Sequence, residues 1–133
     1  MAHRRTTEMI TIEQYQEMAS SIIDELPEEF FDKLNNGVIV SEQCLMHEDS
    51  SPEAPLYVMG QYTRSRMMGR GIVLYYGSFV NTYGHLSEGE QREELRRVIV
   101  HEFRHHMEWR SGTTELEDED REKLKHYRSH FKK

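Results

Sequence analysis

The residues best suited to chemistry in this sequence are two histidines and a glutamate, in the run His-Glu-Phe-Arg-His from His101 to His105. On an α-helix, side chains four residues apart point the same way and lie about 6 Å from each other, so both imidazoles can bind one Zn²⁺ ion at about 2.1 Å. Glu102 directly follows the first histidine, beside the ion and outside its ligand set. There it can act as general base toward a zinc-activated water. The spacing predicts a catalytic zinc site.

A catalytic zinc ion needs a third protein ligand. Glu108 shares the histidine face but lies about 10 Å from His101 along a continuous helix, at 1.5 Å per residue, so we exclude it. A Ser-Gly break at residues 111–112 allows the chain to reverse and brings the acids that follow it back beside the histidines. Glu119 is the predicted third ligand, because it falls on the inner face of the next helix. Asp120 is the alternative, as a ligand or as an acceptor for a histidine N–H.

Two helices must position this site. A capping box, Ser-x-x-Glu, begins at Ser87 and predicts a long helix from there to about Trp109. The C-terminal helix is expected from Leu116 to about Phe131, with acidic residues in its first turn that suit the helix dipole. His106 is rotated about 100° from its neighbour around the first helix, so it is expected to pack or to form a hydrogen bond.

The preceding part of the chain predicts the scaffold. A capping box at Thr11, followed by apolar residues at helical spacing, predicts an N-terminal helix, and Pro27 begins a shorter one. Runs rich in β-branched and aromatic residues predict three or four strands at 38–40, 56–62 and 72–76, in a mixed or antiparallel sheet. Residues 63–71 indicate a basic turn. We therefore expect an α+β fold.

Composition limits the classes of protein that fit. The 133 residues indicate one domain, 1–133, in which residues 1–10 form a flexible N-terminal tail. The net charge of −7 argues against a nucleic acid partner, because such binding relies on Lys and Arg at phosphates. No apolar run can cross a bilayer and no export signal is present, so we expect a cytoplasmic protein without a membrane partner. The single cysteine, Cys44, excludes an internal disulfide.

Several stretches together resemble the small zincin-like bacterial metallopeptidase family, a minimal gluzincin. These stretches cover most of residues 11–128. They are Leu-Pro-Glu-Glu-Phe from Leu26, Asn-Gly-Val-Ile-Val from Asn36, Leu-Tyr-Val-Met-Gly-Gln-Tyr from Leu56, Ile-Val-Leu-Tyr-Tyr-Gly-Ser-Phe from Ile72 and Val-His-Glu-Phe-Arg-His-His from Val100. The resemblance implies a minimal zincin fold with His101 and His105 as ligands and Glu102 as base. The family often has a glycine three residues after the second histidine and an aspartate nearby. This chain has Glu108 there and a longer connection to its acids.

The function predicted from these features is zinc-dependent hydrolysis of a peptide or protein substrate. An edge strand could hold the substrate by adding it to the sheet as an extended strand. The alternative is a non-catalytic zincin scaffold that binds a peptide or protein, and the presence of Glu102 argues against it because a structural zinc ion needs no base. Candidate donors to a developing oxyanion are Tyr83, His85, His126 and Tyr127, and nothing in the sequence chooses among them.

Three arginines in the predicted basic turn, Arg64, Arg66 and Arg70, have two interpretations. They could bind an anionic group of a substrate, or they could form the solvated tip of a hairpin, which is the simpler interpretation. The sequence does not indicate the cleavage preference or the oligomeric state.

Overall fold

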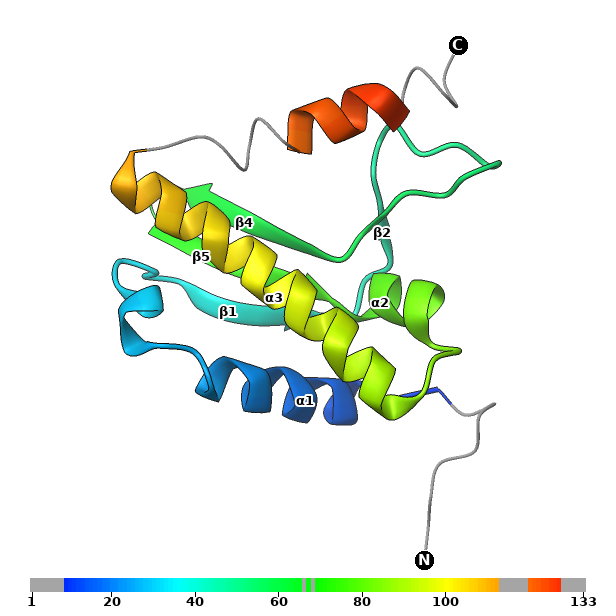
Figure 1. Cartoon of the computed structure of the whole chain (residues 1–133), viewed down its shortest axis with the longest axis horizontal. Helices are drawn as coiled ribbons and strands as arrows, with labels where there is room; N and C mark the ends of the chain where they lie inside the picture. Colours follow the sequence, from blue (N-terminus) through cyan, green and yellow to red (C-terminus); the bar gives the residue numbers. More distant parts are fainter. Residues whose placement is uncertain (1–8, 66, 68, 113–119, 128–133) are drawn as a thin grey trace, which may run out of the picture.

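A three-stranded mixed sheet, in the order β1-β5-β4, forms the centre of the fold (Figure 1). β1 (Gly37–Ser41) runs parallel to β5 (Gly69–Tyr75), and β4 (Gly60–Ser65) pairs antiparallel with β5 and forms an edge of the sheet. β2 (Leu45–Met46) and β3 (Tyr57–Val58) form a separate antiparallel pair. These elements come from a computed structural model that describes residues 9–65, 67, 69–112 and 120–127. The expected α+β fold with a small mixed sheet is confirmed.

The strand boundaries differ from the predicted ones in two places. The predicted strand at 56–62 is divided at Met59 between β3 and β4. The predicted turn at 63–71 is shorter than expected, because its two ends extend β4 and β5 and pair Arg64 with Arg70 across the hairpin. Two of the three arginines therefore lie on strands rather than at the tip.

The N-terminal helix, α1 (Ile12–Asp24), begins at the predicted capping box of Thr11 and Gln14. It buries Tyr15, Ala19 and Ile22 against the sheet and the long helix. Ile10 is also buried, and its carbonyl accepts a hydrogen bond from the Tyr76 hydroxyl at 2.5 Å. The expectation that the flexible tail reaches residue 10 is therefore wrong, because Ile10 belongs to the hydrophobic core. After α1, a 3₁₀ helix (Glu28–Phe31) follows Pro27, where a short helix was predicted.

A short helix that the sequence analysis missed, α2 (Tyr76–Tyr83), follows β5 directly. The predicted strand at 72–76 ends one residue earlier, at Tyr75, because the apolar run continues into this helix. Gly77 allows the helix to lie against the loop before β2, since a Cβ atom at this position would be only 2.6 Å from the backbone nitrogen of Cys44. The Ser78 hydroxyl fixes the same contact by hydrogen bonds to the backbone N–H and carbonyl of Leu45.

The close approach of α2 to the loop before β2 leads to a prediction about stability. Gly77→Ala is expected to lower the free energy of unfolding by about 1–3 kcal/mol, because the new methyl group meets backbone atoms that cannot rotate away. Gly89→Ala, in another helix, is the matched control: its Cβ meets no atom within 4 Å, so stability should stay the same or rise by up to about 1 kcal/mol. Urea unfolding of both variants checks this, and equal stabilities would contradict the packing of α2.

The long helix, α3 (Glu88–Ser111), crosses one face of the sheet and carries the histidine motif (Figure 1). The predicted capping box of Ser87 and Glu90 begins it, and Gly112, in a left-handed conformation with φ of 79°, ends it. Its apolar side, with Leu95, Ile99 and Phe103, is fully buried. No helix among the described residues is both long and apolar enough to cross a membrane.

Two ion pairs near the start of α3 join it to the end of α1. Glu25, which caps the C-terminus of α1, accepts from Arg92 at 2.9 Å and from Arg96 at 2.7 Å. The orientation of α3 follows from these contacts and from the burial of its apolar side. In the C-terminal half of the helix, the side opposite the apolar one therefore faces away from the core. The histidines lie on that side.

Candidate metal centre

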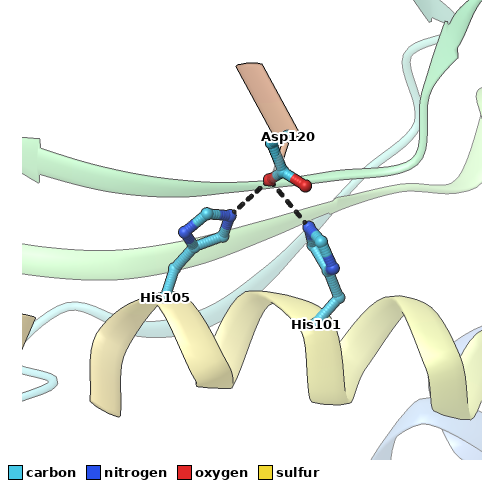
Figure 2. Close-up of side chains that lie close together, drawn as sticks. All are labelled: His101, His105 and Asp120. Atoms are coloured by element: carbon cyan, nitrogen blue, oxygen red, sulfur yellow. Dashed lines mark hydrogen bonds and ion pairs between the residues drawn. The ribbon is translucent and has the colours of Figure 1, made fainter. Parts of the chain in front are cut away.

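The two motif histidines converge on one carboxylate. Nε2 of His101 lies 3.1 Å from Oδ2 of Asp120, and Nε2 of His105 lies 2.9 Å from the same oxygen. Figure 2 shows both imidazoles rising from neighbouring turns of α3 toward the carboxylate, which approaches from a different segment of the chain. Ligand atoms of these three residues all lie within 4.8 Å of one another, and they form the group best suited to a metal ion in the part of the chain described.

This donor set fits a zinc ion. Two imidazole nitrogens and one carboxylate oxygen are a usual set for a catalytic zinc site, whose ligands lie about 2.0–2.2 Å from the metal. The atoms already converge on a common point, and all three side chains are only partly exposed. The same set also accepts other divalent ions that prefer nitrogen and oxygen ligands. The geometry therefore supports a metal site more strongly than it selects zinc.

Asp120 belongs to the helical segment 120–127, which lies beyond the β4 edge of the sheet, near the loop between β2 and β3 (Figure 1). The Tyr127 hydroxyl holds the other end of this segment: it accepts from the backbone N–H of Ser51 at 2.7 Å and donates to the carbonyl of Ala54 at 2.6 Å. Of the two acids considered as third ligand, the structure brings Asp120 to the histidines. Glu119 lies outside the described residues, as do residues 116–118 at the start of the predicted C-terminal helix. Glu108 belongs to no such group among the residues placed in the structure.

Glu102 points from α3 toward β4 and is buried beside the three candidate ligands. The backbone N–H of Tyr62 faces this carboxylate and acts to lower its pKa. Burial raises the pKa of Glu102, and the Asp120 carboxylate acts in the same direction, while His101 and His105 act against it. β4 can approach this carboxylate closely because it has a glycine at Gly60, where a Cβ would lie 3.3 Å from Cγ of Glu102.

His106 is buried behind the candidate metal centre and forms hydrogen bonds there, as predicted from its direction on the helix. Its Nε2–H donates to the carbonyl of Asp32 at 2.6 Å, which leaves Nδ1 to accept from the Tyr62 hydroxyl at 2.6 Å. Burial lowers the pKa of His106, which favours the neutral ring that this pattern requires. The pair links α3 to β4 and so helps to hold Glu102 against the strand.

A cavity of about 940 Å³ opens over the candidate metal centre. α3 forms its floor with Glu102 and both motif histidines, and β3 and β4 form a wall from Tyr57 to Tyr62. Of the four predicted oxyanion donors, Tyr83 lines this cavity, whereas the Tyr127 hydroxyl is already bonded to the backbone of the 51–54 loop. His85 and His126 are not among the lining residues.

The sequence analysis missed one feature of this cavity, an arginine stacked on the tryptophan. The guanidinium carbon of Arg70 lies 3.4 Å from the centre of the Trp109 ring. The sequence prediction places Trp109 only at the end of the helix, although this residue follows His105 by four positions and therefore shares its face. That spacing is the signal that could have placed it at the site.

The fold and the site define an α+β protein in which a long helix and a separate short segment bring together a candidate metal centre. No family model matches the chain, and no curated protein matches it. A similar solved structure is that of a "conserved hypothetical protein" from Thermo thermophilus, with a TM-score of 0.62 and 29% sequence identity. The match covers 77% of this chain and 98% of the other. The likeness supports a common fold, and that description names no activity.

Proposed function

We propose that the protein is a zinc-dependent peptidase of the minimal zincin type. The observation that carries the proposal is the convergence of His101, His105 and Asp120 on one point, with the buried Glu102 carboxylate beside them and outside the ligand set. A ligand set needs no such acid to hold a structural ion, so Glu102 favours catalysis over a purely structural site. The cavity above these residues gives a substrate access to them.

In this proposal the zinc ion, held by the two histidines and Asp120, supplies a Lewis acid toward water and the peptide carbonyl. Glu102 takes the proton from the attacking water and later gives it to the nitrogen of the leaving amine. Burial against β4 at Gly60 holds the carboxylate in place during both transfers. Tyr83, at the cavity wall, is the remaining candidate to donate to the developing oxyanion.

The edge of β4 offers a place for the substrate backbone. Within the part of the chain that the structure describes, β4 pairs with β5 alone, and the Tyr62 N–H points away from β5, toward Glu102. Backbone groups of alternate residues in a strand point the same way, so those of Gly60 and Arg64 face this open edge as well. Both residues line the cavity. A peptide that adds to this edge as an extended strand would pass directly over the candidate metal centre.

Metal content and hydrolysis, measured together, test the proposal. The purified protein is expected to bind about one Zn²⁺ per chain. A chelator should remove both the zinc and the cleavage of a mixed peptide library, and added zinc should restore both. His101→Ala should lose the metal, because it removes one of the three ligands. Full zinc occupancy in that variant would contradict the site, and a zinc-loaded protein that cleaves no peptide would favour a binding scaffold instead.

A further inference from the structure

We propose that a second, smaller cavity next to the metal centre binds a carboxylate group of the peptide, held by Arg64 and Arg70 above Trp109. The inference rests on the proposed function, since it names the class of peptide that the site prefers. Its ligand is an acidic side chain or the C-terminal carboxylate of the peptide, which share the same chemistry.

The cavity has a volume of about 360 Å³ and lies between the β4–β5 hairpin and the end of α3. It shares Arg64, Arg70 and Trp109 with the larger cavity over the metal centre, so the two are adjacent. Its other lining residues are Asn35, Ser65 and Gly69. Among the described residues the lining contains two cations and no acid, which suits an anionic group.

Arg70 is already held in place. Its guanidinium stacks on the Trp109 ring at 3.4 Å, and one of its nitrogens donates to the Tyr62 hydroxyl at 3.3 Å. A guanidinium carries five N–H donors in a planar fork that matches the two oxygens of a carboxylate, so most of its donors remain for a ligand. Because Trp109 and Tyr62 already restrict its rotamers, little side-chain entropy is lost when the ligand binds.

Neither arginine has an acidic partner among the residues that the structure places. Arg64 lies opposite Arg70 in the hairpin, and no carboxylate of the described residues forms an ion pair with either. Arg97, which lines the larger cavity, is different, because its guanidinium is bonded to Glu94 at 2.6 Å. Two neighbouring cations without a counter-charge gain from an anion that bridges them.

The position of this cavity determines which part of the peptide reaches it. Trp109 is one helical turn beyond His105, about 6 Å along α3. Arg64 is two residues beyond Tyr62, about 7 Å along β4. A peptide extended along β4 would therefore place a carboxylate here when its side chain, or its C-terminus, lies one or two residues from the bond at the metal centre.

The single tryptophan of the chain, Trp109, makes the test direct, because it lines both cavities and its fluorescence reports on peptide binding next to the metal centre. Zinc-loaded Glu102→Gln protein, which should bind peptides without cutting them, is titrated with peptide pairs that carry Glu or Gln at one position, each with a free or an amidated C-terminus. At one position the carboxylate peptide is expected to bind about tenfold more tightly, the order of a charge-assisted hydrogen bond. Calorimetric titration of the same pairs gives the affinity independently of the fluorescence change.

Two substitutions identify the group that binds the carboxylate. Arg70→Gln and Arg64→Gln are made as separate variants; Arg64 is exposed. Each should reduce the preference for the carboxylate peptide severalfold or abolish it, with little effect on the affinity for the Gln peptide. Arg97→Gln is the matched control and should keep the full preference, because its charge is already paired. A preference that depends on amidation identifies the C-terminus as the ligand, and one that depends on Glu identifies a side chain.

Equal affinities for all Glu and Gln peptides, free and amidated, would overturn this inference, as would a preference that survives in both arginine variants. Cleavage by the wild-type protein is measured separately, so the two proposals fail in different ways. Hydrolysis without a carboxylate preference would leave the peptidase proposal intact. A carboxylate preference without hydrolysis would leave the anion site intact and argue for a peptide-binding protein.

Discussion

Glu102→Gln is expected to reduce peptide hydrolysis by about 10²–10⁴-fold while the fold and the metal content stay unchanged. The amide cannot accept the proton of the attacking water, so the general base is lost. The glutamine side chain has nearly the same shape as that of glutamate, so the packing against β4 at Gly60 is kept. The measurement is cleavage of a peptide library by both proteins, with zinc content and circular dichroism recorded on the same samples.

Glu93→Gln is the matched control, because it removes a carboxylate from an exposed position on the same helix. It should cleave like the wild type. Activity that survives in Glu102→Gln at the wild-type level would point to another base or to a contaminating protease. A loss of zinc in that variant would mean that Glu102 takes part in holding the metal, contrary to its position outside the ligand group.

Asp120→Ala is expected to weaken zinc binding by about 100-fold or more, because it removes the only carboxylate that lies within reach of both histidines in the described part of the chain. The aspartate also brings a negative charge toward the cation, which the two neutral imidazoles cannot replace. Competition with a zinc indicator measures the change, and the histidine variants give the scale for the loss of a ligand.

Two further variants test the choice among the acids. Glu108→Ala should change the zinc affinity little, since that residue lies a turn beyond His105 on the same helix. Glu119→Ala distinguishes the ligand predicted from the sequence from the one that the structure brings to the site. A larger loss in Glu119→Ala than in Asp120→Ala would restore the sequence prediction and contradict the contact at 2.9–3.1 Å.

The sequence was sufficient to predict the parts of the site that lie on one helix. His101, Glu102 and His105 are positioned by a capping box and by helical periodicity, both of which are local properties of the chain, and the structure has the helix within two residues of its predicted end. The cap of α1 at Thr11 followed from the same kind of signal. Such features are readable because their hydrogen bonds join residues three or four positions apart.

Contacts between distant segments could not be read in this way. The choice between Glu119 and Asp120 depends on how a second segment docks on α3, and neighbouring residues on a helix differ by about 100° in direction. The start of α2 was missed because an apolar run suits a buried strand and a buried helix equally well. The stacking of Arg70 on Trp109 joins residues 39 positions apart in sequence, and it depends on how α3 packs across the sheet.

The attachment of segment 120–127 at both of its ends has an energetic consequence. One end contacts α3 through Asp120, and the other, about 10 Å away along the helix, is tied to the 51–54 loop by the Tyr127 hydroxyl. Docking of the segment and completion of the ligand set are then a single linked equilibrium, in which the apparent dissociation constant of the metal is the intrinsic one divided by the docked fraction. Tyr127, whose hydroxyl is hydrogen-bonded to the backbone of the 51–54 loop, would thereby contribute to the affinity for the proposed metal ion by raising the population of the docked state.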